Sequence, residues 1–142
     1  MRAEPGFEVF EHTADVGIVA RGTTLADAFA QAARGMYALM VDLDRVEPRE
    51  SRELQLEASD PERLLVQWLV DLLFLTETER LVFSAFAIEV DAKRGTLRAR
   101  ASGEALDPDR HDAGYDVKAV TYHDLELVED ADGWRLRVIF DV

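Results

Sequence analysis

Residues 64–75 form an almost unbroken apolar run, interrupted only by Gln67 and Asp71. Asp60, just before the run, is a good helix N-cap, and Pro61 stands where the first turn of a helix accommodates proline. The run therefore predicts a helix whose apolar side chains point in nearly all directions. Such a helix must be covered nearly all round, so it is either the central buried helix of the fold or an interaction face.

Another helix, this one amphipathic, is predicted over residues 25–41. Thr24 followed by Asp27 resembles a capping box at its start. Gly35 within the helix costs roughly 1 kcal/mol relative to alanine and indicates close packing at that position. Apolar residues recur through the segment at helical spacing, which predicts one buried face: Leu25, Ala28, Phe29, Ala32, Met36, Leu39 and Met40.

Most of the remaining chain alternates between apolar and polar residues, as half-buried strands do. Asp132-Gly133 is a hairpin turn signal before the last strand. The apolar parity changes within residues 117–128, and one register cannot bury both sets, so we expect a bulge or bend near His123. The predicted strands cover residues 7–11, 16–21, 53–58, 86–91, 97–102, 117–128 and 134–142.

The order of these elements predicts an α+β fold, with two helices packed on a mixed, mostly antiparallel β-sheet. The order strand, helix, strand, helix also suggests an internal strand–helix duplication. A chain of 142 residues is long enough for one domain with a real core and too short for two comfortable ones. We therefore expect a single domain over residues 1–142.

Composition excludes several kinds of function. The chain has no cysteine, which rules out disulfides, thiolate zinc sites and cysteine nucleophiles. No apolar run reaches the roughly 18 residues of a membrane span, and residues 1–6 do not resemble a signal peptide, so we expect a cytoplasmic protein without a membrane partner. The net charge of −13 repels phosphate backbones and favours cations and basic proteins. We therefore expect no direct nucleic-acid binding, although the charge could also serve solubility alone.

Carboxylates from both ends of the chain are the main candidates for chemistry. The last predicted strand stays apolar to Phe140 and Val142, so the chain end is expected to be pinned in the sheet. Asp141 has the parity opposite to the core-facing residues and should point outward. If Asp15 meets this end, Asp15, Asp141 and the terminal carboxylate of Val142 converge, and like charges gather this way only around a cation. Oxygen ligands suit calcium, magnesium or manganese. Alternatively, Asp15 is a cap or a solvated loop residue.

Three stretches of the chain resemble the archease family: residues 12–18 (HTADVGI), 118–123 (KAVTYH) and 140–142 (FDV). The resemblance implies an α+β protein that binds a metal through the motif aspartate and the chain end, here Asp15, Asp141 and Val142. It also implies a partner, an RtcB-type RNA ligase. The implied role is to promote guanylylation of that ligase with GTP and a divalent metal, which allows repeated rounds of tRNA ligation.

Other polar residues have weaker claims to a site. His12 and His123 are more often hydrogen-bonded structural histidines than ligands. Lys118 could offset the carboxylates or touch a phosphate, and His111 is expected to be solvated in a polar loop. The sequence has neither a glycine-rich phosphate loop nor a nucleophile elbow. The alternative function is a stand-alone, divalent-metal-dependent phosphoesterase that uses the same carboxylates.

Overall fold

The structure is a computed structural model that describes residues 4–12 and 15–142. Its helices are α1 (Leu25–Met40) and α2 (Pro61–Glu79), with a short 3-10 turn at Leu43–Arg45. Strands form in every region where alternation predicted one, mostly with longer bounds, except that the strand predicted over residues 117–128 is divided. They are β1 (Gly6–His12), β2 (Asp15–Gly22), β3 (Glu50–Glu57), β4 (Leu81–Asp91), β5 (Thr96–Ala105), β6 (Ala119–Val120), β7 (Glu126–Asp130) and β8 (Gly133–Asp141).

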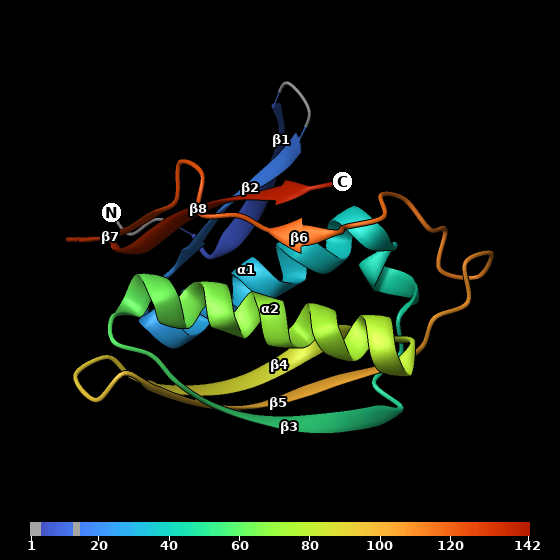
Figure 1. The fold of residues 1–142 in the computed structure, drawn as a ribbon, viewed down its shortest axis with the longest axis horizontal. Helices are drawn as coiled ribbons and strands as arrows, with labels where there is room; N and C mark the ends of the chain where they lie inside the picture. The colour runs from blue at the N-terminus through green and yellow to red at the C-terminus, as the bar shows by residue number, and fades with distance from the viewer. Residues whose placement is uncertain (1–3, 13–14) are drawn as a thin grey trace.

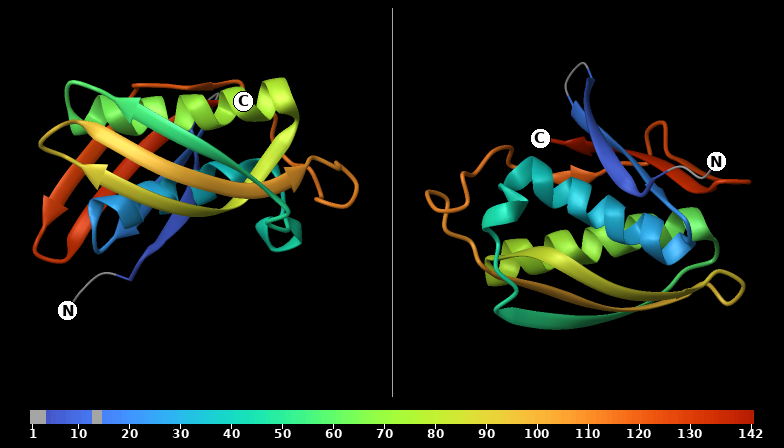
Figure 2. Two further views of the ribbon diagram at one scale, coloured as in Figure 1. Left: turned by 90° about the horizontal axis from the view of Figure 1, so that it is seen from below. Right: turned by 180° about the vertical axis from the view of Figure 1, so that it is seen from behind.

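Two antiparallel sheets enclose the two helices, which confirms the α+β class (Figure 1). One sheet has the order β1-β2-β8-β6, with β7 also paired to β8, and the other has the order β3-β5-β4. Seen from behind, α1 and α2 again lie between the sheets (Figure 2). Every pairing in the described part of the chain is antiparallel, so the expected mixture with parallel strands is wrong. One strand–helix unit begins in each sheet, and their duplication stays a prediction.

The apolar composition of α2 follows from this layered arrangement. Asp60 accepts a hydrogen bond from the Arg63 backbone N–H at 2.8 Å and so caps the helix as predicted. Trp68 is fully buried, and its indole N–H donates to the backbone carbonyl of Phe29 on α1 at 3.0 Å. Coverage is not complete, however, because Phe74 is exposed and Val70 is partly so. The α2 helix is thus the central buried helix, but one of its sides, which carries Val70 and Phe74, is exposed to solvent.

The α1 helix packs closely against β2. Thr24 caps it by accepting from the Asp27 backbone N–H at 3.0 Å, whereas the Asp27 carboxylate accepts from the Thr23 N–H rather than from the cap residue itself. A Cβ atom at Gly35 would lie 2.9 Å from a terminal methyl of Ile18, which confirms the close packing predicted for this glycine. The contact between α1 and β2 fixes the position of the five-stranded sheet, on which the candidate site lies, against the helix.

The predicted long strand over residues 117–128 is in fact two short strands separated by a turn. Leu125 donates its N–H to the carbonyl of Tyr122 at 3.2 Å, and Asp124 adopts a positive φ of 50°. Both β6 and β7 pair with β8, on either side of this turn. The bend expected near His123 is confirmed, and it is large enough to end one strand and start another.

Neither helix in the described part of the chain has the length and apolar character needed to cross a membrane.

Candidate functional site

The end of β8 brings distant parts of the chain together. Asp141 stands opposite Asp15 of β2 on one side and opposite Ala119 of β6 on the other. The backbone N–H of Lys118 donates to the carbonyl of Asp141 at 2.8 Å. The chain end is therefore pinned between two strands, as predicted, and described residues of the three stretches that carry the family resemblance meet where β2, β8 and β6 pair.

Asp15 and Asp141 share the outer face of that sheet. Leu136, Val138 and Phe140 of β8 are fully buried against the helices, so Asp141 faces the opposite way, which confirms the outward parity. Residues directly opposite on antiparallel strands have Cβ atoms about 4.5–5.5 Å apart. Asp15 is half-buried and Asp141 is exposed. Two carboxylates at this separation repel each other unless a cation or a proton lies between them.

Within the described residues, neither carboxylate has a hydrogen-bond or ion-pair partner, and no third His, Cys, Asp or Glu joins them in a metal-binding group. Val142 follows Asp141 directly, and its side chain packs against the core. This packing restrains the position of the residue whose carboxylate is the third predicted ligand. An all-oxygen set of this kind fits a hard divalent cation, and the ligand roles of Asp15, Asp141 and Val142 stay predictions.

The other candidates are placed less favourably. Thr13, Ala14 and the side chain of His12 lie outside the described residues. His123 is exposed in the turn between β6 and β7, where its ring nitrogen lies 3.5 Å from the carboxylate of Asp124. Lys118 is exposed and lines a groove beside α2. The structure thus puts the backbone of Lys118 at the site and leaves the roles of both side chains as predictions.

The sequence did not predict that an aromatic ring, that of Phe10, lies on the same strand pair as Asp15. The ring of Phe10 lies over Gly17, where a Cβ atom would come within 2.2 Å of it. The guanidinium carbon of Arg137 lies 4.6 Å from the centre of the same ring, a cation–π contact. Gly17 is therefore needed for this close approach and not for an unusual backbone conformation, since its φ is not positive.

Comparison with known proteins identifies the relatives of this chain. The model of the Archease protein family matches residues 7–142. A "Protein archease" from Sulfurisphaera tokodaii is 40% identical over 136 residues, covering 96% of this chain and 98% of that protein. Another from Aeropyrum pernix is 42% identical over 135 residues, covering 93% and 94%. The chain belongs to the archease family.

The fold leads to the same archease relatives. The solution structure of protein 1598 from Methanobacterium thermoautotrophicum superposes with a TM-score of 0.84 at 37% identity, covering 96% of this chain and 99% of that one. The archease family match spans Asp15, Asp141 and Val142 together. The range matched by the family model therefore contains the whole candidate site.

The sequence predicted that His111 is solvated, and the structure shows that this prediction is wrong. The side chain is fully buried: Nδ1 accepts from the Asp107 backbone N–H at 3.0 Å, and Nε2 lies 3.2 Å from the carboxylate of Glu104. Since Nδ1 accepts, Nε2 carries the proton and donates to Glu104. The backbone carbonyl of His111 accepts from the Asp42 N–H after α1. His111 is thus a structural residue that fastens the loop following β5.

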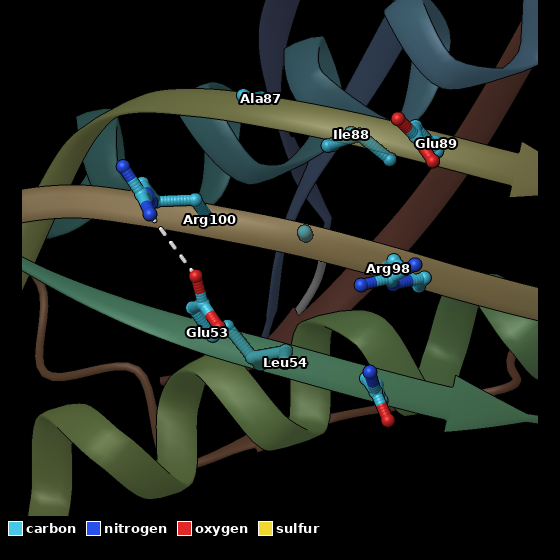
Figure 3. Close-up of a pocket in the computed structure, with 9 residues that line it drawn as sticks. Glu53, Leu54, Ala87, Ile88, Glu89, Arg98 and Arg100 are labelled. Atoms are coloured by element: carbon cyan, nitrogen blue, oxygen red, sulfur yellow. Dashed lines mark hydrogen bonds and ion pairs between the residues drawn. The ribbon is translucent and has the colours of Figure 1, made fainter.

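Away from the carboxylate site, a hollow lies on the outer face of the three-stranded sheet (Figure 3). Its lining includes Ala87 of β4 and both arginines of the neighbouring β5 segment, Arg98 and Arg100. Arg100 pairs with Glu53 of β3 at 3.0 Å, and Glu89 stands opposite Arg98 in the register of β4 and β5. Opposite charges alternate across this hollow, and it belongs to a different sheet from Asp15 and Asp141. It therefore contributes nothing to the carboxylate site.

Proposed function

We propose that this protein activates an RtcB-type RNA ligase in tRNA splicing or RNA repair. It promotes guanylylation of the ligase, so that each ligase molecule can complete repeated rounds of joining. The observation that carries this proposal is the pairing of Asp15 with Asp141 at the end of β8, in a chain of the archease family. The names of its relatives are not those of enzymes, which fits an accessory role.

The proposed cofactor is a divalent metal, either calcium, manganese or magnesium. Asp15, Asp141 and the carboxylate of Val142 would hold it, because three oxygen donors with negative charge suit a hard cation. A bound cation of this type neutralises charge and can orient phosphate oxygens. The protein's own contribution is positional: β2 and β8 hold two carboxylates at a fixed separation, on a face where the helices do not cover them.

The proposed partner is a protein rather than RNA. A net charge of −13 raises the local concentration of basic partners and disfavours phosphate backbones. The ligase, which must itself hold RNA and nucleotide, offers the complementary charge. We accordingly place this protein in the cytoplasm with the ligase, without direct contact to nucleic acid.

A ligase guanylylation assay with and without this protein tests the proposal. Incorporation of labelled GMP into the ligase and the number of ligation turnovers should both rise when the protein is added. Asp15→Asn, which removes one charge and keeps the side-chain shape, should abolish the stimulation. Glu129→Gln, an equal change at an exposed position of β7, is the matched control and should stimulate like the wild type.

Thermal melts of the same proteins keep the result interpretable. Removal of one of two repelling carboxylates should leave the midpoint unchanged or raise it in the presence of a chelator. Full stimulation by a folded Asp15→Asn protein would contradict the assigned role of Asp15. Manganese-dependent phosphatase turnover that requires Asp15, without any effect on a ligase, would favour the stand-alone phosphoesterase instead.

A further inference from the structure

The open face of α2 carries apolar side chains that the fold does not cover. Phe74 is 61% exposed and Val70 is 38% exposed, although the rest of this apolar helix is largely buried between the sheets. The two residues are four apart and therefore adjacent on one side of the helix. In Figure 1 this helix lies in front, between the edge strands β6 and β3 of the two sheets.

Phe74 stands between two grooves. The first runs between α2 and β6 and is lined by Val70, Leu73, Glu77 and residues 118–120 in addition to Phe74. The second runs between α2 and β3 on the other side of the same ring. An aromatic side chain flanked by hollows on both sides can be enclosed by a partner, which is the arrangement of an interface anchor.

The rim of these grooves is acidic. Glu77 lines the groove next to β6, while Asp71 and Glu53 line the groove next to β3. Among the lining residues of both grooves, Lys118 is the only one with positive charge. A partner that covers Phe74 therefore has to bring positive charge to the rim, because an acidic surface would be repelled.

The groove next to β6 adjoins the carboxylate site. Its wall, Ala119 and Val120, pairs with Asp141 and Phe140 of β8, and adjacent strands lie about 4.8 Å apart. A segment seated on Phe74 and the edge strand β6 would thus lie one strand away from Asp141 and two strands away from Asp15. A partner that docks on this surface would therefore lie next to the carboxylates of the candidate site.

We propose that the face of α2 formed by Val70 and Phe74, together with β6, is a docking surface for a basic protein segment that inserts an apolar side chain beside Phe74. The inference rests on the proposed function, since we assign this segment to the surface of the ligase. Docking here holds the carboxylates of Asp15 and Asp141 against the partner. The acidic rim supplies orientation, and Phe74 supplies most of the binding energy.

Calorimetric titration of the purified ligase with this protein tests the docking surface. Phe74→Ala should raise the dissociation constant about tenfold or more, the effect expected of an aromatic anchor. Glu77→Lys should also weaken binding, and the wild-type affinity should fall as salt is raised. Because Phe74 is exposed, the thermal midpoint of Phe74→Ala should stay close to that of the wild type, and Phe74→Tyr should bind nearly as well.

Matched controls lie on distant surfaces. Val9→Ala removes an apolar side chain that is 47% exposed on β1, the opposite edge of the five-stranded sheet. Glu89→Lys makes the same charge change as Glu77→Lys on the outer face of the other sheet. Both controls should bind and activate the ligase like the wild type, and their loss of binding would indicate a general effect of charge or folding that overturns the assignment.

The outcomes separate this inference from the proposed function. If Phe74→Ala binds and activates the ligase as well as the wild type does, the docking surface is wrong while the proposed function stands. If the wild type neither binds nor activates the ligase, both are wrong. A wild-type dimer in sedimentation that Phe74→Ala dissociates would assign the face to a second copy of this chain and overturn the inference.

Discussion

At the scale of single residues, Glu104 of β5 connects the loop before β3, which contains Glu47, with the loop after β5, which contains Arg110 and His111. Its carboxylate is buried and accepts from the side chains of Arg110 and His111 and from the Glu47 backbone N–H at 2.7 Å. The hydrogen bonds from Arg110, more than any other contact, lower the pKa of Glu104 to about 2. Since His111 also reaches the segment after α1, loss of this carboxylate should loosen the connection between α1 and β5.

The lowered pKa predicts how stability changes with pH. Glu104 ionises near its ordinary pKa of 4.5 in the unfolded chain and near 2 in the fold, so it stabilises the fold fully above about pH 4.5. This contribution is lost as the pH falls toward 2. Glu104→Gln should cost about 1–3 kcal/mol of unfolding free energy at pH 7, with a smaller cost at pH 3. Urea unfolding at both pH values measures the difference.

Glu129→Gln serves as the control for this measurement, because Glu129 is exposed on β7. It should change the unfolding free energy by less than about 0.5 kcal/mol at either pH. A cost of Glu104→Gln that is the same at pH 3 and pH 7 would contradict the role assigned to its charge.

At the scale of the elements, β8 is the strand on which the candidate site depends. It pairs with β2 along one edge and with β6 and β7 along the other, so its end is held on both sides. Asp141 is thereby fixed opposite Asp15, and Val142 packs against the core. Chain ends usually fray, and one that is tied down in this way can carry a positioned ligand.

An extension of the chain beyond Val142 should weaken metal binding. Gly-Ser-Gly added after Val142 turns its carboxylate into a neutral amide and directs the chain through the space proposed for the cation. The site then loses one of about three negative charges, so the calcium dissociation constant should rise by about tenfold or more. Calorimetry measures the change, and stimulation of ligase guanylylation should fall with it.

The same tripeptide placed before Met1 is the control for this extension, because β1 lies at the opposite edge of the sheet from β6. This variant should bind calcium as the wild type does. If the protein extended after Val142 also binds calcium normally, Val142 is not a ligand, and the proposed site reduces to Asp15 and Asp141.

At the scale of the whole molecule, net charge decides which class of partner can approach. With a charge of −13, long-range repulsion of RNA should outweigh local attraction by single exposed arginines. We predict that tRNA forms no complex with this protein alone in a gel-shift assay, even at low salt, where electrostatic attraction is strongest. A tight complex with naked tRNA that salt dissolves would contradict this prediction and the proposal of a protein partner.

Local patterns in the sequence determined most of the elements. Thr24 and Asp60 predicted where α1 and α2 begin, because a cap acts on the backbone N–H groups of the next few residues. Alternation predicted the strands, and Asp132-Gly133 predicted the turn into β8. The outward direction of Asp141 also followed from parity, since side chains on a strand alternate between two faces. All of these depend on contacts only a few residues apart in the chain.

Only the tertiary structure decided the arrangement of those elements. The division of the strands between two sheets, with β8 placed between β2 and β6, depends on pairing across more than a hundred residues, which local periodicity does not encode. Residues 117–128 break into β6 and β7 because both sides of the turn pair with the same strand. His111 lies in a polar segment of the sequence, yet it is buried because Glu104 and Asp107 satisfy both ring nitrogens. Phe74, conversely, stays exposed because α2 faces the gap between two sheet edges, and burial is a property of the assembled layers.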